Sequence, residues 1–335
     1  MTKNRIVTLA ARPVGWPKES DFRLVEEPLP KAADGEIVIQ SRYLSLDPYM
    51  RGRMNDRKSY AEPVKLGGGM TGEVVGRVVE SRSDRFKVGD TAAAMCGWQE
   101  FGSVAARHAR KVNADAAPVS TALGVLGMPG LTAWFGLMEV GRLRPGETVF
   151  VSGAAGAVGA TVGQIAKLNG CRAVGIAGTD DKVAHLVDEL GFDAAFNYRH
   201  TKDYLAALRE QCPNGIDVSF DNVGGEIGDA ALIHLNQHGR VVICGQSSQY
   251  NLDKPEMGPR LLWSLIVKRA RIEGFLVSDF ASRFGEALPR LTEWVLSGQL
   301  KYREHIVDGL ENAPRAFIDM LRGKHVGKQL VRVSE

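Results

Sequence analysis

The stretch Val149–Gly159 reads V-F-V-S-G-A-A-G-A-V-G and sharply narrows the possible folds. Thr148–Val151 has the apolar, β-branched composition of a buried parallel strand, and the residues after Gly159 favour a helix. A strand, a glycine-rich turn and a helix in this order are what a dinucleotide-binding turn requires. Ala154 stands where the usual G-x-G-x-x-G pattern has its first glycine, so a plain strand-to-helix turn is the alternative interpretation.

Two glycines of this turn have distinct expected roles. Gly156 allows a close approach of the backbone to a pyrophosphate, and Gly159 allows the helix to pack tightly on the strand. The free N–H groups at the start of the helix would bind the phosphates.

Strands alternate with helices after this turn, which predicts a parallel sheet with right-handed crossovers. Counting Thr148–Val151, six strands are expected, as in a doubly wound dinucleotide-binding fold. The other strands are Cys171–Ala177, Ala194–Tyr198, Ile216–Asp221, Arg240–Gly245 and Arg271–Val277. The helices expected between and after them are Asp180–Leu190, Lys202–Gln211, Glu226–Gln237, Arg260–Arg269 and Arg283–Ser297.

The first 125 residues have a different pattern, with short β-rich segments separated by Gly and Pro. Examples are Glu36–Leu44, Glu73–Val79 and Thr91–Ala94, which predict a mostly antiparallel, partly barrel-like domain. Near the C-terminus, Glu304–Val307, Ala313–Leu321 and Gln329–Val333 predict a strand, a helix and a strand that return to this domain. Gly127–Gly136 is expected at the crossing, which gives one domain of residues 1–125 completed by 302–335 and another of residues 126–301.

Composition excludes several classes of protein. A hydrophobic share of 44% and a net charge of only +3 suit a soluble enzyme and argue against a nucleic-acid partner. No apolar run has the length of a membrane span, so no membrane partner is expected. The four cysteines lie far apart with no C-x-x-C pair, which favours a reducing compartment, by default the cytoplasm.

The end of the second predicted strand indicates which cofactor binds. An NAD site has an acidic residue there that binds the ribose hydroxyls, but this strand ends in Gly178. Lys182, one turn into the next helix, is placed to reach a 2′-phosphate, and Tyr198 and Arg199 add a ring and a second cation. This pattern favours NADPH. Two alternatives stay open: Lys182 is a solvated helix residue, or one of the neighbouring acids, Asp180 or Asp181, is the ribose ligand.

The whole chain resembles the zinc-independent medium-chain dehydrogenase/reductase superfamily. It is most similar to the NADPH-dependent leukotriene B4 12-hydroxydehydrogenase/prostaglandin reductase, alkenal double-bond reductase and curcumin reductase family. The motifs that carry the resemblance are Leu46–Arg51 (L-D-P-Y-M-R), Gly127–Ala133 (G-M-P-G-L-T-A), Ala154–Gly159, Phe196–Arg199 (F-N-Y-R), Asp221–Gly225 (D-N-V-G-G), Cys244–Asn251 (C-G-Q-S-S-Q-Y-N) and Phe275–Val277. The resemblance implies a six-stranded Rossmann domain that binds NADPH, a mostly β GroES-like catalytic domain, and a homodimer that pairs the sixth strands.

The resemblance also implies the cofactor contacts. The pyrophosphate, the adenosine 2′-phosphate, the riboses and the nicotinamide with its carboxamide would each be bound by a short segment of the Rossmann domain. These residues are Ala155, Gly156, Ala157 and Val158 for the pyrophosphate; Gly178, Lys182 and Tyr198 for the adenosine side; Asn222, Cys244, Gly245, Ser247 and Tyr250 for the riboses and nicotinamide; Phe275, Leu276 and Val277 for the carboxamide; and Met128 and Thr132 beside the nicotinamide. His325 stands where the family commonly has Asn, so its role stays open.

Zinc catalysis lacks its ligands in this sequence. A zinc alcohol dehydrogenase needs a Cys near the first catalytic loop and a His before the Glu of its G-H-E segment. Here that loop is Leu44–Pro48 (L-S-L-D-P), and Gly72 precedes Glu73. The pair His234 and His238 is expected at a helix end and has no third ligand, so no metal is expected.

Without a Lewis acid, conjugate reduction is the reaction that needs least assistance. Hydride adds to the β-carbon of an enone or 2-alkenal, and one donor at the carbonyl oxygen stabilises the enolate. Tyr250, just past the fifth strand, is the candidate donor, directly or through a ribose hydroxyl; a structural loop tyrosine is the alternative. Tyr49 is expected on the substrate side. Arg51 would attract a carboxylate-bearing substrate or form a structural salt bridge.

The sequence therefore predicts an NADPH-dependent reductase of the α,β double bond of enones and 2-alkenals, acting on a small-molecule substrate. A quinone oxidoreductase of the same superfamily is the enzymatic alternative, and a non-catalytic NADPH-binding redox sensor is the alternative of another class. The sequence does not determine the shape of the substrate pocket, so the physiological substrate and any use of quinones or alcohols are left open.

Overall fold

A computed structural model describes residues 3–334. The chain divides into two compact units, one formed by Met1–Gly124 with Glu304–Glu335 and the other by Val125–Arg303. No helix within residues 3–334 is both long enough and apolar enough to cross a membrane.

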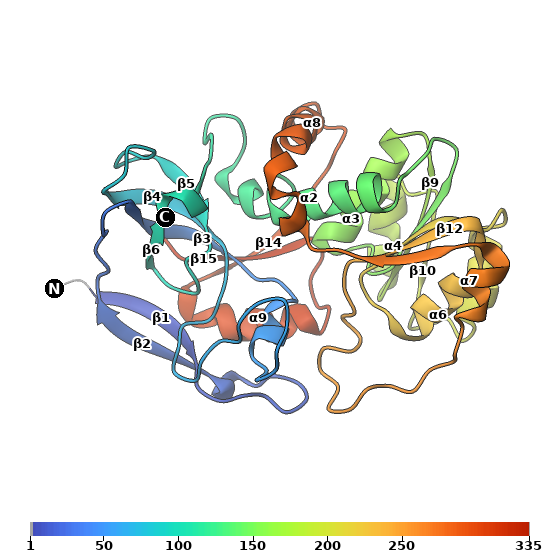
Figure 1. Cartoon of the computed structure of the whole chain (residues 1–335), viewed down its shortest axis with the longest axis horizontal. Coiled ribbons are helices and arrows are strands. Elements are labelled where there is room, and N and C mark those ends of the chain that lie inside the picture. The colour runs from blue at the N-terminus through green and yellow to red at the C-terminus, as the bar shows by residue number, and fades with distance from the viewer. Residues whose placement is uncertain (1–2, 335) are drawn as a thin grey trace. The chain divides into compact units, whose positions relative to one another are not determined.

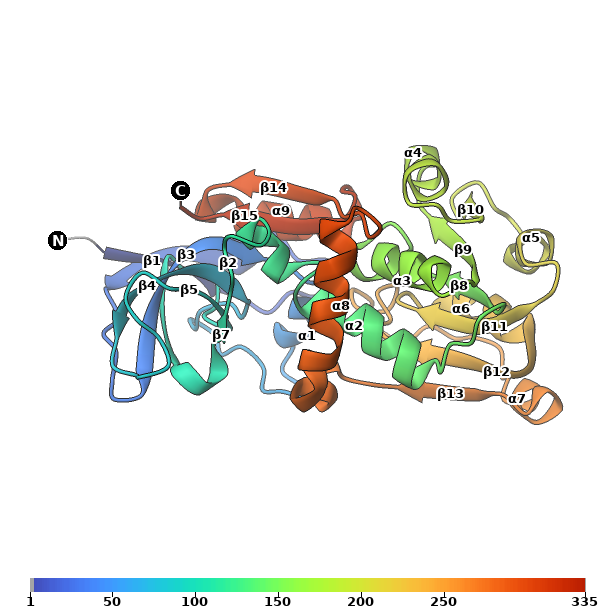
Figure 2. The ribbon, with the colours of Figure 1, turned by 90° about the horizontal axis from the view of Figure 1, so that it is seen from above.

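The second unit contains the predicted parallel sheet. Its strands follow the order β10-β9-β8-β11-β12-β13 and are all parallel (Figure 2). The order reverses between β8 and β11, as in a doubly wound fold, which confirms the predicted fold class. The strands are β8 (Thr148–Val151), β9 (Arg172–Ala177), β10 (Ala194–Asn197), β11 (Ile216–Asp221), β12 (Leu235–Ile243) and β13 (Arg271–Gly274).

Helices cover both faces of this sheet. In the view of Figure 1, α2 (Met128–Phe135) and α3 (Ala157–Leu168) lie above it, whereas α6 (Gly225–Ile233) and α7 (Trp263–Lys268) lie below it. The remaining helices of the unit are α4 (Asp180–Ala184), which continues as a π-helix over His185–Glu189, α5 (Tyr204–Gln211) and α8 (Phe284–Leu296). Gly163 allows α3 to pack closely against Phe192, because a Cβ at position 163 would lie 1.9 Å from the ring of Phe192.

Several predicted bounds in this unit are wrong. The helix expected over Glu226–Gln237 ends at Ile233, and β12 already begins at Leu235. The polar run L-N-Q-H-G hides the start of this strand. It pairs with β11 through an irregular register, with His238 at a φ of 62°. The strand expected over Arg271–Val277 ends at Gly274, because a 3-10 helix begins at Val277.

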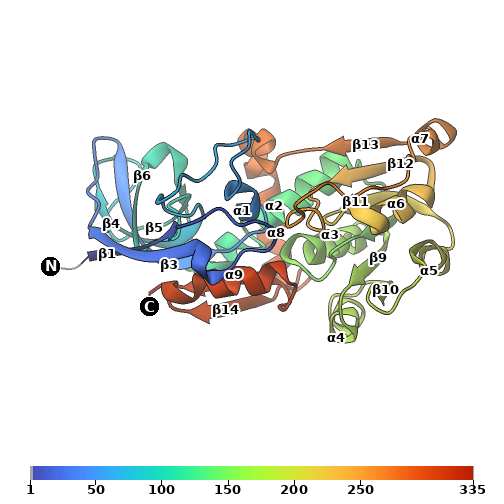
Figure 3. The same cartoon turned by 90° about the horizontal axis from the view of Figure 1, so that it is seen from below.

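The first unit is mainly antiparallel. Its larger sheet has the order β14-β15-β3-β4-β5-β7, with β6 paired to β3; within residues 3–334 the pair β14 and β15 is parallel and the other pairs of this sheet are antiparallel. The helix α9 (Ala313–Leu321), which is labelled in Figure 3, packs against β15. The strands are β1 (Lys3–Leu9), β2 (Phe22–Pro28), β3 (Glu36–Ser45), β4 (Val74–Ser81), β5 (Thr91–Ala94), β6 (Phe101–Ala105), β7 (Arg110–Lys111), β14 (Glu304–Asp308) and β15 (Lys328–Arg332).

The core of this unit is organised around Trp98, which is fully buried. Its ring stacks on Phe22 at 5.7 Å between centroids and meets Phe317 of α9 edge-on at 5.5 Å. A short helix, α1 (Met50–Arg53), follows β3 and carries the predicted substrate-side residues. Packing of these aromatic rings thus stabilises the sheet that contains β3, the strand that precedes α1.

Candidate functional site

The carboxyl ends of β8 and β11 form the centre of the candidate dinucleotide site, because the strand order reverses between them. Asp221, the last residue of β11, is buried, and its Oδ1 accepts hydrogen bonds from Ser152 Oγ at 2.6 Å and from the N–H groups of Val223 and Gly224. Asn222 donates from Nδ2 to the carbonyl of Ser152 at 2.7 Å. This network joins the turn after β8 to the turn after β11, at the sheet edge where a dinucleotide is expected.

Sequence reasoning missed Ser152 and Asp221 as members of this site. The sequence signal that could have identified Asp221 is its position as a charged residue at the end of the buried strand segment V-S-F-D. The predicted contact residue Asn222 does lie at the correct edge of the sheet. Its amide nitrogen is used within the protein, which leaves its Oδ1 as the atom that can face a ribose hydroxyl.

The turn after β8 has the backbone geometry of a phosphate cradle. Gly156 is the N-cap of α3 in an extended conformation, and no side chain caps the helix, so first-turn N–H groups stay available for an anion. A Cβ on Gly159 would lie 2.5 Å from the carbonyl oxygen of Gly153, so only glycine fits there. The predicted residues Ala155, Ala157 and Val158 lie on this turn and on the start of α3.

The adenosine side is formed at the ends of β9 and β10. Gly178 has no acid beside it; the ring of Tyr198 fills the space, since a Cβ on Gly178 would lie 2.9 Å from that ring. Lys182 is half-buried, and its pKa is lowered by loss of solvent and by the nearby positive charge of Arg199. The Arg199 guanidinium also lies 5.9 Å from the Tyr198 ring centroid. Two cations close enough to repel one another favour a bound anion.

The two acids left as possible ribose ligands differ in their surroundings. Asp180 accepts a hydrogen bond from Asn197 Nδ2 at 2.8 Å and lies 3.5 Å from His200 Nδ1. Its carboxylate therefore holds the start of α4 to the end of β10. Asp181 is exposed. The geometry thus favours the cations Lys182 and Arg199, and not Asp180 or Asp181, as the residues that face the adenosine side.

The loop after β12 folds back over the same edge of the sheet. Cys244 and Gly245 donate their N–H groups to the carbonyl of Asp221, and Ser247 donates to that of Asn222. Burial raises the pKa of the Cys244 thiol to about 12, with the Asp221 carboxylate as the second cause, so this cysteine is a neutral thiol and not a nucleophile.

Tyr250 closes this loop on itself. Its phenol oxygen accepts the N–H of Gln246 at 3.4 Å, and a Cβ on Gly245 would lie 3.1 Å from the same oxygen. The hydroxyl is therefore placed at the carboxyl end of β12, as predicted. The same contact is compatible with a purely structural loop tyrosine, so the catalytic role stays a prediction.

The remaining predicted cofactor residues lie on β13 and α2. Phe275 packs against Gly136 and meets the ring of Phe280 at 6.3 Å, which anchors the start of the segment Phe275–Val277. Leu276 uses both its N–H and its carbonyl in the turn to Asp279. On α2, Thr132 donates its hydroxyl to the carbonyl of Met128 at 2.7 Å, so these two residues share one face of the helix.

Together these features fit a phosphorylated dinucleotide. In the second unit, no side chain caps the N-terminus of α3, and the glycine turn before this helix has no space for a side chain at Gly159. The ends of the neighbouring strands add two cations, Lys182 and Arg199, and the ring of Tyr198. The residues present thus suit both a pyrophosphate and a further phosphate on the adenosine ribose.

In the first unit, the loop before α1 is held by a buried ion pair. Lys328 Nζ contacts Asp47 Oδ1 at 2.6 Å and donates to the carbonyl of Leu46 at 2.7 Å. Ser45 Oγ also donates to Asp47. Asp47 and Lys328 are 281 positions apart in the sequence, so no local sequence pattern predicted this ion pair.

A second carboxyl group lies in the same cluster. Burial raises the pKa of Glu73 to about 7; the positive charge of Arg110 opposes this shift and the Asp47 carboxylate adds to it. Arg110 itself donates to the carbonyl of Ala122 at 2.9 Å. Glu73 is thus an acid that changes its charge near neutral pH.

Tyr49 is the N-cap of α1 and is partly buried beside this cluster. Burial, with the carboxylates of Asp47 and Glu73, raises the pKa of its phenol above the usual range, so the phenol stays protonated. This keeps it a hydrogen-bond donor at all physiological pH values.

Arg51 is only 3% exposed. Its guanidinium donates to the carbonyl of Gly15 at 2.8 Å and to Asn55 Oδ1 at 2.7 Å. These contacts support the structural alternative for Arg51 rather than the attraction of a substrate carboxylate.

The position before Glu73 is closed to a metal-binding side chain. A Cβ on Gly72 would lie 2.9 Å from both Leu44 and Trp98. Among residues 3–334, no group of three or more His, Cys, Asp or Glu side chains is arranged to hold a metal ion. His234 is the C-cap of α6, whereas His238, expected on the same helix end, lies within β12.

His325 is partly buried in the first unit. Its ring lies 6.4 Å from that of His305 on β14.

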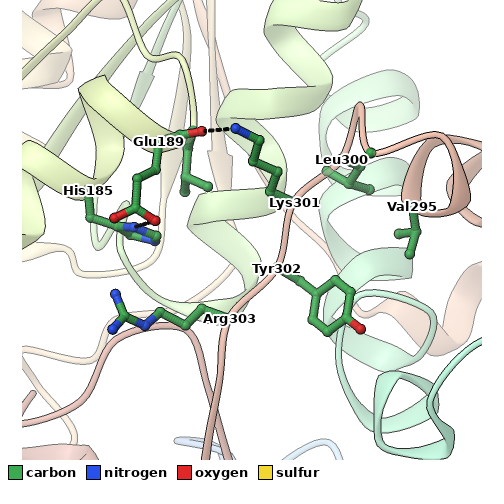
Figure 4. A pocket seen from close by; sticks show the side chains of 9 residues that line it. His185, Glu189, Val295, Leu300, Lys301, Tyr302 and Arg303 are labelled. Carbon is green, nitrogen blue, oxygen red and sulfur yellow. Dashed lines mark hydrogen bonds and ion pairs between the residues drawn. The ribbon is translucent and has the colours of Figure 1, made fainter.

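A cavity of about 470 Å³ lies elsewhere in the second unit (Figure 4). None of the predicted site residues lines it. In Figure 4 the side chains of His185 and Glu189 face one another, with 3.0 Å between Nδ1 and the carboxylate, and Lys301 reaches the carbonyl of Glu189 at 2.9 Å. Three of its polar residues, His185, Glu189 and Lys301, thus contact one another, and none of the lining residues belongs to the predicted dinucleotide site.

Comparison with known proteins agrees with this arrangement. Residues 5–112 match a family described as the N-terminal domain of oxidoreductase, and residues 157–293 match one described as zinc-binding dehydrogenase. The chain is 43% identical to the NADPH-dependent curcumin reductase of Escherichia coli (strain K12), covering 99% of this chain and 97% of that protein. It is 42% identical to the NADP(+)-dependent 2-alkenal reductase of Nicotiana tabacum, covering 99% and 98%.

A solved structure extends the likeness to the fold. CurA from Vibrio vulnificus in complex with NADPH is 43% identical, with a TM-score of 0.94 over 99% of both chains. The likeness is therefore end to end and includes both units.

Proposed function

This chain belongs to the medium-chain dehydrogenase/reductase family of prostaglandin, 2-alkenal and curcumin reductases, and we propose that it reduces the α,β double bond of enones and 2-alkenals. It is an NADP-dependent oxidoreductase that acts on carbon–carbon double bonds. The observation that carries the proposal is the dinucleotide edge of the second unit, where the charges of Lys182 and Arg199 interact and the Arg199 guanidinium lies near the Tyr198 ring. The second unit is proposed as the NADPH-binding domain and the first as the substrate domain.

Bound NADPH supplies the hydride, which is delivered to the β-carbon of the substrate. Charge then moves to the carbonyl oxygen of the substrate as an enolate, and a hydrogen-bond donor there lowers the barrier. A proton that ultimately comes from water then adds to the α-carbon and completes the saturated product. Tyr250 is proposed as this donor, directly or through a ribose hydroxyl. Its phenol lies at the carboxyl end of β12, where its oxygen accepts the N–H of Gln246.

The reaction is proposed to be independent of zinc, although one matching family is described as zinc-binding. The support is the packing at Gly72, where Leu44 and Trp98 leave no space for a histidine. In place of a Lewis acid, a protonated tyrosine hydroxyl polarises the substrate carbonyl. Tyr49 is proposed to contact the substrate from the first unit.

A homodimer is proposed through the edge strand β13. This strand ends the sheet, and the helix before it exposes Leu262, Trp263 and Ile266, with Trp263 at 70%. An unpaired edge next to exposed apolar side chains favours pairing with a second copy. Light scattering should give twice the mass of the chain; a monomer would contradict this proposal.

A cytoplasmic location is proposed from the cysteines. All four are free thiols, and Cys96, Cys171 and Cys212 are buried. Reduced cysteines that take part in packing are typical of a reducing compartment.

The experiment that tests the proposed reaction follows the hydride. NADPH carrying deuterium at the transferred position is incubated with a simple enone, and the product is examined by NMR. We expect a saturated ketone with deuterium on the β-carbon. Deuterium on the carbinol carbon of an allylic alcohol would show carbonyl reduction and contradict the proposal, and a quinone as the only substrate would favour the alternative enzyme.

A further inference from the structure

The two arginines of α1 differ in what their guanidinium groups contact. Arg51 is buried and donates to Asn55 Oδ1 and to the carbonyl of Gly15, whereas Arg53 is only partly buried. Two residues apart on a helix, their side chains leave the axis about 200° apart. The side chain of Arg53 therefore points away from the buried face of α1 that Arg51 occupies.

Arg53 lies over two aromatic rings. Its guanidinium carbon is 4.4 Å from the ring centroid of Tyr60 and 5.8 Å from that of Tyr49. Electrostatic interactions of Tyr49 with both Tyr60 and Arg53 place the three side chains in one cluster. Tyr49 is the ring proposed on the substrate side, so the cluster adjoins the substrate region of the first unit.

No carboxylate neutralises this guanidinium. In residues 3–334 no ion pair and no hydrogen bond from the Arg53 side chain is found. The nearest acid in sequence, Asp56, lies 3.8 Å from Arg12 instead, and Asp47 is paired with Lys328. A cation–π contact uses the charge of the guanidinium and leaves its five N–H donors available.

A partly buried, unneutralised guanidinium is a strong site for an anion. Planar N–H donors match a carboxylate in a bidentate fork, and partial exclusion of water strengthens the interaction. The aromatic rings restrict the rotamers of the long side chain, so little entropy is lost when an anion binds. Tyr60 is 58% exposed, so the cluster is open to solvent on that side.

We propose that Arg53 is a specificity-determining residue that binds a carboxylate on the substrate, at a distance from the double bond. This inference rests on the proposed enone reduction. It assigns to the enzyme a preference for α,β-unsaturated ketones or aldehydes that carry a carboxylate at the other end of the molecule.

The test compares one enone acid with its own methyl ester. Both contain the same double bond and chain, and only the charge differs. For the wild-type enzyme, we expect kcat/KM to be higher for the acid. Arg53→Gln should lower the acid-to-ester ratio about tenfold, mainly through KM for the acid, with little effect on the ester. Arg53→Lys keeps the charge without the fork and should retain part of the preference.

Arg57→Gln is the matched control, because it removes one positive charge four residues further along, from an exposed side chain. We expect it to leave the ratio unchanged. An equal loss in Arg57→Gln, an unchanged ratio in Arg53→Gln, or an equal loss of activity on acid and ester would each overturn the assignment. If the wild-type enzyme reduces neither compound, the proposed function itself fails, which separates the two outcomes.

Discussion

Lys182→Ala should convert a strong preference for NADPH into a weak one. The lysine is half-buried near a second cation, and both effects lower its pKa, so an adjacent phosphate would relieve an unfavourable charge in the free protein. At about 4 Å, an ion pair is worth about 1 kcal/mol in water and about 4 kcal/mol at an effective dielectric constant near 20. An intermediate value of about 2 kcal/mol corresponds to about a thirtyfold change in affinity.

The measurement is the dissociation constant of each cofactor, followed by the fluorescence of the nicotinamide. We expect the constant for NADPH to rise about thirtyfold and that for NADH to change by less than about twofold, because only NADPH carries the 2′-phosphate. Arg209→Ala, which removes an exposed charge from the last turn of α5, is the control. Equal weakening of both cofactors, or no change for NADPH, would refute the assignment of the phosphate site.

Three further predictions address other parts of the account. Tyr250→Phe should lower kcat by about a hundredfold while the dissociation constant for NADPH changes little, as stopped-flow rates and titration would show; an unchanged kcat would assign the donor role elsewhere. Asp221→Ala leaves two N–H groups and the Ser152 hydroxyl without their acceptor, so denaturant unfolding should show a loss of about 3 kcal/mol or more, with Asp221→Asn retaining most of the stability. Burial raises the pKa of Glu73 to about 7 from an ordinary 4.5, so the folded state keeps a proton that the unfolded state releases, and stability should fall by up to about 3 kcal/mol as pH rises from about 4.5 to about 7. Glu73→Gln should flatten that part of the stability curve, and an identical pH dependence in both proteins would contradict the reasoning.

The parallel sheet was predictable because buried strands have a distinctive composition. Ile216–Asp221 and the glycine turn after Val151 are local signals, and the structure has them where the sequence indicated. The start of β12 was not predictable, because its first residues are polar and join the sheet only through a bulge at His238. The local sequence pattern therefore predicted those strands in which burial is uniform along the length of the strand.

Contacts between distant parts of the chain were beyond sequence reasoning. The pair Asp47–Lys328 and the bond from Ser152 to Asp221 join residues 281 and 69 positions apart, and no periodicity encodes such distances. The burial of Arg51 and the partial exposure of Arg53 depend on which face of one helical turn is packed against the protein. That face is determined by tertiary packing, which composition does not report.

The central claim is that NADPH-dependent reduction occurs at a carbon–carbon double bond, and one rate comparison tests it most directly. Oxidation of the nicotinamide is followed by its absorbance with NADPH and an enone, then with NADH and the same enone, and with NADPH and a quinone. The account predicts rapid oxidation only in the first reaction, with a saturated ketone as product. Oxidation by the quinone alone, or equal rates with NADH and NADPH, would contradict it.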